Sequence, residues 1–263
     1  MSAPSLDEVR SGGQPPGLKN RRNEEHWAGR LYMRSISPYF TWLFVRIGFS
    51  PNQLTYMMIV CGMLGGVAVA VTADGTVGLV WAIVGALLIQ AYLLLDCSDG
   101  EVARFRKRTS ITGIFLDRIG HYMSEVTLLA GLGVRAQGAW ENGGYVELGL
   151  LAALGAALIK AETDNVVVAR AKAGLPADPE TGDRALRPES TGLALAREAV
   201  SMLKFHRIIG AVELSLLIVA ASVVDQLVGG ITATRVLAVA VAVVAVLQTG
   251  LHFVSIVASR RLK

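Results

Sequence analysis

The sequence predicts an all-α, polytopic membrane protein with six transmembrane helices and an N-terminal interfacial amphipathic helix in front of them. Of its 263 residues, 52% are hydrophobic and 17% are charged, whereas soluble domains average roughly 25% charged residues. Apolar runs recur along the chain, and about 20 residues are enough for a helix to cross a bilayer. These runs lie at residues 53–73, 77–95, 114–134, 145–168, 208–229 and 231–258.

The residues before the first apolar run divide into a tail and a short amphipathic segment. Residues 1–35 are polar and contain glycine and proline pairs, so we expect a mobile cytoplasmic tail. Residues 36–49 are apolar and aromatic, are interrupted by Arg46 and are too short to span. They favour a helix along the inner membrane surface, with an irregular lead-in as the alternative. We expect residues 36–263 to form one membrane domain.

The distribution of basic residues predicts the orientation. Lys and Arg gather before the first run, after the second, after the fourth and at the C-terminus, whereas the other three loops carry almost none. Positively charged loops stay cytoplasmic. We therefore expect both termini, the polar loop 174–204 and the active site to be cytoplasmic, in an integral protein of a bacterial cytoplasmic (inner) membrane. No nucleic acid partner is expected.

Acidic residues cluster where the second run ends and the third begins. Positions three or four apart share one face of a helix, so two stripes are predicted. The first comprises Asp96, Asp99, Gly100 and Ala103, and the second comprises Gly113, Asp117 and His121. The loop between the two helices is short, which makes them antiparallel neighbours. The stripes are therefore expected to face each other at the cytoplasmic end.

These residue types in this arrangement predict a metal-bound diphosphate site. Three carboxylates and an imidazole near hydrocarbon are costly unless a cation neutralises them. Oxygen ligands suit Mg²⁺ or Mn²⁺, and we expect two ions. Gly100 and Gly113 let phosphates approach the helices closely, and the guanidinium of Arg104 offers a planar fork for phosphate. The alternative is a set of solvated charges at a helix end.

The spacing resembles the motif of the CDP-alcohol phosphotransferase (CDP-alcohol phosphatidyltransferase) family, D-x2-D-G-x2-A-R-x8-G-x3-D-x3-D. The matching residues are Asp96, Asp99, Gly100, Ala103, Arg104, Gly113 and Asp117. The segment 50–55, Ser-Pro-Asn-Gln-Leu-Thr, also resembles the P-N-x-L-T start of the family's first span. The resemblance covers roughly residues 36–260.

The resemblance implies an enzyme that transfers a substituted phosphate from a CDP-alcohol to an acceptor hydroxyl and releases CMP, in phospholipid or related phosphodiester biosynthesis. The donor would be CDP-diacylglycerol or a CDP-linked small alcohol, and the acceptor a small polyol, a phosphorylated polyol or a lipid. A homodimer surrounded by membrane lipids is also implied. Asp96, Asp99 and Asp117 would hold the metals. The residues implied to contact the CDP-alcohol are Asn52, Thr55, Asp99, Gly100, Ala103, Arg104 and Gly113.

The sequence departs from the motif at its fourth aspartate, which is His121 here. A neutral imidazole can bind a metal or accept a proton near pH 7. We therefore expect His121 to act with Asp117 in catalysis and to serve as a metal ligand. The alternatives are a neutral packing histidine, an unusual acceptor, or a catalytically weak member of the family.

Two further hypotheses concern residues outside the motif. Basic side chains that could bind a phosphate on the acceptor are Arg118, Lys160, Arg170 and Arg207, and anchoring at the membrane surface is their alternative role. A transporter or cation-binding protein would also place acids inside a membrane. Such sites lie near the bilayer midplane, whereas this cluster borders a basic loop at one end. Glu125, Glu213 and His252 are expected to be interior.

Overall fold

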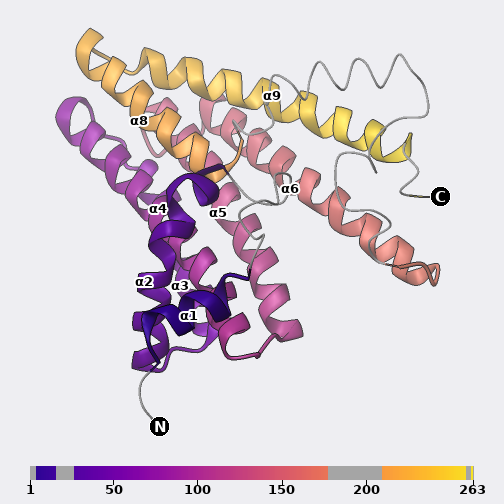
Figure 1. Cartoon of the computed structure of the whole chain (residues 1–263). Coiled ribbons are helices and arrows are strands. Elements are labelled where there is room, and N and C mark those ends of the chain that lie inside the picture. Colours follow the sequence, from indigo (N-terminus) through magenta and orange to yellow (C-terminus); the bar gives the residue numbers. More distant parts are fainter. Residues whose placement is uncertain (1–3, 16–26, 177–208, 259–261, 263) are drawn as a thin grey trace. The chain divides into compact units, whose positions relative to one another are not determined.

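The computed structural model describes residues 4–15, 27–176, 209–258 and 262, and these are helical without any strand. The elements in chain order are α1 (Leu6–Gly13), the π-helical turn η2 (Gly29–Met33), α2 (Arg34–Ile47), α3 (Pro51–Val69), α4 (Gly75–Phe105), α5 (Ile111–Gln137), α6 (Gly144–Lys172), α8 (Ala211–Val228) and α9 (Thr232–Val257) (Figure 1). The all-α class is therefore confirmed.

Two compact units divide the chain. Unit 1 comprises Met1–Gly65 and Leu87–Ser124, and unit 2 comprises Gly66–Ala86 and Glu125–Lys263. Helices α3, α4 and α5 each begin in one unit and end in the other. Each unit is described below by itself.

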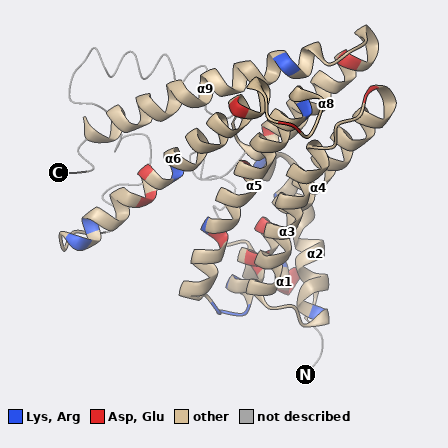
Figure 2. Ribbon diagram, turned by 180° about the vertical axis from the view of Figure 1, so that it is seen from behind, with Lys and Arg blue, Asp and Glu red and all other residues tan. Residues whose placement is uncertain are grey.

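Five helices in the described ranges are long and apolar enough to cross a membrane, namely α3, α4, α6, α8 and α9. Helix α5 has 27 residues and is not among those five. Uncharged residues make up most of every long helix (Figure 2). The chain is thus an integral membrane protein, and the sixth span stays a prediction.

The local sequence explains where the helices that carry the site begin and end. Ser50 and Gln53 form a capping box before α3, since the Gln53 side chain accepts from the Ser50 amide at 2.9 Å and Ser50 Oγ accepts from the Gln53 amide at 3.3 Å. Helix α2 ends at Gly48, whose φ of 89° is left-handed and suits glycine. Ser110 Oγ caps α5 by accepting from the Gly113 amide at 2.9 Å.

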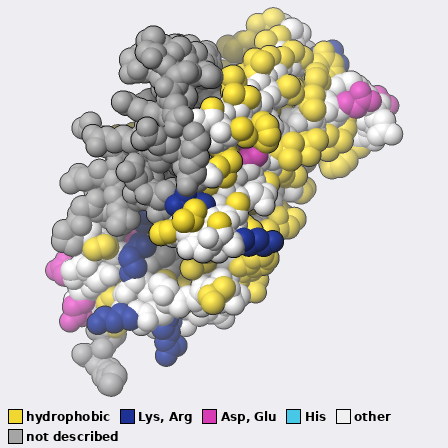
Figure 3. Space-filling view, turned by 90° about the vertical axis from the view of Figure 1, so that its right-hand side faces the viewer, with side chains coloured by type: hydrophobic (Ala, Val, Ile, Leu, Met, Phe, Trp, Pro, Cys, Tyr) yellow, Lys and Arg dark blue, Asp and Glu magenta, His cyan; other side chains and the backbone are white. Residues whose placement is uncertain are grey.

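Most of the buried residues of α6 and α9 in unit 2 are small. Helices α6 and α9 lie side by side (Figure 1), and a Cβ added to Gly155 would lie 3.2 Å from Ala245 Cβ. Close approach at small residues drives helix association in lipid, where burying large apolar side chains gains little. Large apolar side chains of α9 such as Val243 and Leu247 are exposed. Figure 3 shows hydrophobic side chains covering much of the described surface on one face.

Helix α1 lies within residues 1–35, the segment expected to be a mobile cytoplasmic tail, and that expectation stays a prediction. Its Ser5 and Glu8 form a capping box. Near its other end, a Cβ on Gly12 would lie 2.9 Å from the Phe105 ring and one on Gly13 would lie 3.2 Å from Glu101 Cβ. The two glycines therefore let α1 approach α4 closely in unit 1. Regular helix also starts before residue 36, with η2 and the first turn of α2.

Helix α2 occupies the segment expected to be the interfacial helix. Ser37 and Thr41, one turn apart, are fully buried in unit 1. Large apolar residues of α2 remain exposed, among them Tyr39, Leu43 and Ile47. This exposed apolar face is what an interfacial helix presents to lipid, and its place at the membrane surface stays a prediction.

Candidate functional site

A pocket of about 290 Å³ in unit 1 lies among the first turn of α3, the C-terminal part of α4, the loop after it and the start of α5. Its lining comprises Arg34, Pro51, Asn52, Thr55, Asp96, Asp99, Gly100, Ala103, Arg108, Thr109, Ser110, Gly113, Ile114 and Asp117. Eight of the residues expected to bind the CDP-alcohol or metal line this pocket. The two stripes predicted on α4 and α5 therefore meet in one cavity.

Three of the expected metal ligands converge beside this cavity. Asp96, Asp117 and His121 each offer one ligand atom, and these atoms lie within 4.8 Å of one another. His121 Nε2 lies 3.4 Å from Asp96 Oδ1 and 3.6 Å from Asp117 Oδ1. Two carboxylates and an imidazole at this spacing form a donor set that fits a divalent cation. Part of each side chain is exposed, so a cation can reach it.

The His121 ring is held from its other side by Tyr92 of α4. The Tyr92 hydroxyl hydrogen-bonds His121 Nδ1, and the two rings pack edge to face with centroids 5.7 Å apart. When Tyr92 accepts the Nδ1 proton, Nε2 keeps a lone pair for a cation or a proton. When Tyr92 donates, Nε2 carries hydrogen and bonds to Asp96 or Asp117. The tautomer of His121 and the direction of the Tyr92 hydrogen bond therefore depend on each other, and no sequence signal pointed to Tyr92.

Asp99 is buried and differs from the other two aspartates. Its Oδ2 accepts a hydrogen bond of 2.6 Å from Thr55 Oγ1, and it lies outside the group formed by Asp96, Asp117 and His121. It still lines the pocket. Thr55 of α3 thus fixes the rotamer of Asp99, which leaves the second carboxylate oxygen for the pocket.

The two motif glycines keep the pocket open. A Cβ on Gly113 would lie 3.1 Å from Asn52 Oδ1, and one on Gly100 would lie 3.1 Å from Arg104 Nη1. Contacts this short force the neighbouring side chain to move. Substitution at Gly113 would therefore displace Asn52, a residue expected to contact the donor.

Arg104, which we expected to bind phosphate, is absent from the residues that line this pocket but lies beside one of them, since a Cβ on Gly100 would lie 3.1 Å from its Nη1. Its Nε donates to the Gly13 carbonyl at the end of α1 at 2.7 Å, and its buried Nη2 has no partner among the described residues. The basic side chains that line the pocket are instead Arg34 and Arg108. The structure therefore adds two cations to the site that sequence reasoning missed.

Glu101 organises the N-terminal segment around the site. It is buried, with 1% of its surface exposed, and accepts hydrogen bonds from Ser37 Oγ at 2.6 Å and Thr41 Oγ1 at 2.7 Å. Arg34 Nη1 and Gln14 Nε2 reach the same carboxylate at 3.2 and 2.8 Å. Ser37 and Thr41 lie four residues apart and so share one face of α2, but their spacing alone does not identify Glu101 as the partner.

The residues proposed to bind an acceptor phosphate belong to both units. Arg118 belongs to unit 1, whereas Lys160 and Arg170 belong to unit 2. Lys160 pairs with Glu125 at 3.3 Å, and Arg170 Nε donates to the Pro176 carbonyl at 2.9 Å. Arg207 and most of the loop 174–204 lie outside the described residues. An acceptor site built from these residues stays a prediction.

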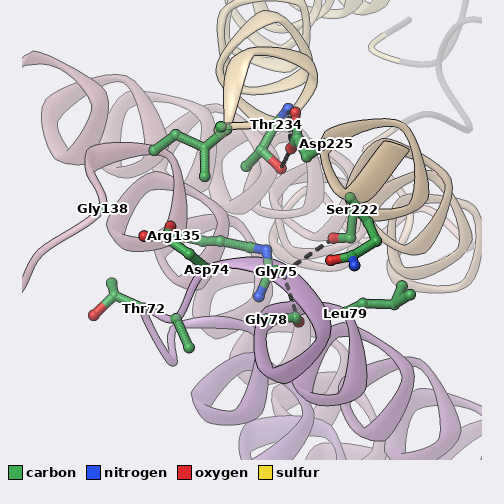
Figure 4. A pocket seen from close by; sticks show the side chains of 14 residues that line it. Thr72, Asp74, Gly75, Gly78, Leu79, Arg135, Gly138, Ser222, Asp225 and Thr234 are labelled. Atoms are coloured by element: carbon green, nitrogen blue, oxygen red, sulfur yellow. Dashed lines mark hydrogen bonds between the residues drawn. The ribbon is translucent and has the colours of Figure 1, made fainter. Parts of the chain in front are cut away.

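A second pocket, of about 70 Å³, lies in unit 2 where α4 begins, α5 ends and α8 turns into α9 (Figure 4). Arg135 Nη2 donates to the Gly78 carbonyl at 2.6 Å and to Ser222 Oγ at 3.1 Å. Asp225 accepts from the Thr234 amide at 3.0 Å and from Thr234 Oγ1 at 2.6 Å. Its carboxylate caps α9, and the other acidic residue that lines this pocket is Asp74.

Known proteins resemble the part of the chain that carries the unit 1 pocket. The family model described as CDP-alcohol phosphatidyltransferase matches residues 49–179. The bifunctional IPC transferase and DIPP synthase of Aquifex aeolicus (strain VF5) is 29% identical over 106 residues, which are 40% of this chain and 22% of that protein. The matched part of this chain thus spans about a fifth of that relative's length.

Proposed function

Because the chain belongs over residues 49–179 to the CDP-alcohol phosphatidyltransferase family, a family of transferases, we propose that it transfers a substituted phosphate from a CDP-alcohol to an acceptor hydroxyl and releases CMP. The observation that carries the proposal is the convergence of Asp96, Asp117 and His121 beside a cavity of about 290 Å³. The cavity is large enough for part of a nucleotide and is lined by six of the seven matching motif residues, all except Arg104.

Each group of residues has a role in this proposal. Asn52, Thr55, Gly100, Ala103 and Gly113 form the walls against which the cytidine diphosphate lies. The metal ligands would be Asp96, Asp99 and Asp117, and His121 would join them only while its Nε2 is not accepting a proton. Arg104 and Arg108 add positive charge nearby. Two Mg²⁺ or Mn²⁺ ions bound there would neutralise the diphosphate and the charge that develops on it during transfer.

Proton transfer is the task that we propose for His121 and Asp117. The acceptor hydroxyl loses its proton to His121, and its oxygen attacks the phosphorus distal to cytidine. A new P–O bond forms as the bond to the CMP oxygen breaks. The side chains hold donor and acceptor in line, and positioning supplies much of the rate acceleration.

Purified full-length protein tests the reaction directly. With Mg²⁺ present, we expect CMP release from CDP-diacylglycerol or from a CDP-linked small alcohol, paired in turn with a small polyol, a phosphorylated polyol and a lipid acceptor. Product masses identify the pair, and EDTA should stop the release. A protein that releases no CMP with any pair but moves cations into liposomes would be a transporter instead.

The orientation is part of the same proposal, because a CDP-alcohol made in the cytoplasm must reach the pocket. We propose that both termini and the loop 174–204 are cytoplasmic, in a bacterial inner membrane, and that the protein is a homodimer. Single cysteines introduced into that loop should resist an impermeant thiol reagent in intact cells. Cysteines at residues 137–143 should react, and the reverse pattern would overturn the orientation.

A further inference from the structure

Unit 1 contains a basic residue at the pocket that lies outside the part of the chain matched by the family model. Arg34 is the first residue of α2 and lines the cavity together with Asp96, Asp99 and Gly100. The matched region starts at residue 49. The Nε of the motif arginine, Arg104, donates to the Gly13 carbonyl of α1. Arg34 thus adds a basic side chain to the pocket that the motif does not include.

The position of Arg34 is determined by Glu101 on the neighbouring helix. Its Nη1 lies 3.2 Å from Glu101 Oε1 and 3.4 Å from the Cys97 carbonyl oxygen. Only 12% of the Arg34 side chain is exposed. A long arginine side chain has several rotatable bonds, and an ion pair at one guanidinium nitrogen restricts most of them. The guanidinium is thereby fixed at the pocket before any ligand binds.

Glu101 also accepts hydrogen bonds from residues other than Arg34. Ser37 and Thr41 from α2 and Gln14 after α1 all donate to it. A buried carboxylate needs such donors, because removing it from water costs several kcal/mol. The donors also bind α2 to α4, so the network sets the register of α2 and hence the place of Arg34.

Charge at the pocket explains why a further cation is useful. Three carboxylates, those of Asp96, Asp99 and Asp117, line the cavity, and its basic lining residues are Arg34 and Arg108. A diphosphate is an anion and would be repelled by the carboxylates alone. A guanidinium can bind phosphate oxygens in bidentate fashion.

Resting on the proposed function, we propose that Arg34 binds the diphosphate of the CDP-alcohol and that Glu101 is its positioning residue. Arg34 touches the substrate, whereas Glu101 acts only through Arg34 and α2. The proposal makes the N-terminal segment, which the family model does not match, part of the donor site.

Titration of the full-length protein with CDP in Mg²⁺ tests the proposal. A charge-assisted hydrogen bond contributes enough that Arg34→Gln should weaken CDP binding roughly ten- to hundredfold. Arg34→Lys keeps the charge without the planar fork and should lose less. Arg46→Gln is the matched control, because Arg46 lies on the same helix and stacks on Trp42 at 4.6 Å, away from the pocket lining. It should bind CDP like wild type.

A double-mutant cycle tests the role of Glu101. Glu101→Gln should weaken CDP binding severalfold, and the pair Arg34→Gln with Glu101→Gln should bind no more weakly than Arg34→Gln alone. If Glu101 has only a structural role, Glu101→Gln should lower the thermal midpoint and leave the CDP affinity of the folded protein unchanged.

The outcomes separate this inference from the proposed function. Wild type that fails to bind CDP overturns the proposed function. Wild type that binds CDP, with Arg34→Gln and Arg34→Lys binding within about twofold of it, overturns the role of Arg34 alone, since a lost charge-assisted contact changes affinity by more than that. Should Arg34→Gln not fold, Arg34→Lys and Glu101→Gln carry the measurement.

Discussion

The pockets of unit 1 and unit 2 both contain aspartates, but those aspartates contact different groups. In unit 1, Asp96 and Asp117 converge on His121 Nε2 at 3.4 and 3.6 Å. In unit 2, Asp225 accepts from the Ala233 amide at 2.7 Å as well as from the amide and hydroxyl of Thr234. Donors at the start of α9 therefore satisfy Asp225, whereas the converging carboxylates of Asp96 and Asp117 repel each other and favour a cation. The comparison sets a carboxylate with backbone donors beside a pair whose proposed role is to bind a metal.

The largest effect is expected where the carboxylates converge. Asp96→Asn and Asp117→Asn should each lower CMP release at least about a hundredfold, because a neutral amide replaces a charged metal ligand poorly. Asp99→Asn should behave similarly. The thermal midpoint should change little, which the same preparations can report. Comparable CMP release in EDTA and in Mg²⁺ would remove the basis for this prediction.

Substitution of His121 should have the second-largest effect on activity, because the remaining carboxylates can still hold a cation. His121→Ala should lower CMP release roughly ten- to hundredfold while keeping most CDP affinity. His121→Asp restores the motif and should retain more activity than the alanine variant. Equal activity of His121→Ala and wild type with their true substrates would make His121 a packing residue.

Tyr92→Phe should have a smaller effect on the same reaction. The phenylalanine keeps the ring contact with His121 and removes the hydroxyl, so roughly tenfold slower CMP release is expected if the hydroxyl orients the imidazole. The double variant Tyr92→Phe with His121→Ala should then match His121→Ala alone. Additive losses would show that Tyr92 acts independently of His121.

Asp225 in unit 2 is expected to affect stability and leave the chemistry unchanged. Asp225→Ala removes the cap of α9 and should destabilise the protein by about 1–2 kcal/mol, measured by thermal or denaturant unfolding in detergent. CMP release per folded molecule should stay at the wild-type level. A hundredfold loss of activity without unfolding would show that both pockets serve the reaction.

The smallest effect is expected for Thr234→Val, which keeps the side-chain shape and the backbone amide bond to Asp225. Losing one hydroxyl donor should cost about 0.5–1.5 kcal/mol of stability. A loss larger than that of Asp225→Ala would contradict the capping role that we assign to the pair.

Features that depend on residues close together in the sequence could be predicted from the sequence. The apolar runs predicted α3, α4, α6, α8 and α9, because crossing a bilayer requires a length of apolar helix whatever the neighbours are. The spacing of Asp96 and Asp99 along one helix face, and that of Asp117 and His121 along another, follows from 3.6 residues per turn. A short loop between the two helices then brings these faces together.

Contacts between distant residues were decided by the tertiary structure. Glu125 forms an ion pair with Lys160, and Glu162 lies 2.7 Å from His252 Nδ1. Both contacts join different helices, and the periodicity along one helix does not predict the register of its neighbour. For the same reason the sequence could not show that Glu101 gathers Arg34, Ser37 and Thr41.

The N-terminal segment shows this limit most clearly. Its composition is that of a mobile tail, because a short polar helix such as α1 has little stability of its own. Gly12 and Gly13 allow α1 to lie against α4 in unit 1, and Arg104 donates to its last carbonyl. Local sequence therefore determined the helices and the motif faces of this protein. Only tertiary packing decided which arginine reaches the pocket, since that choice depends on α1 and α2 docking on α4.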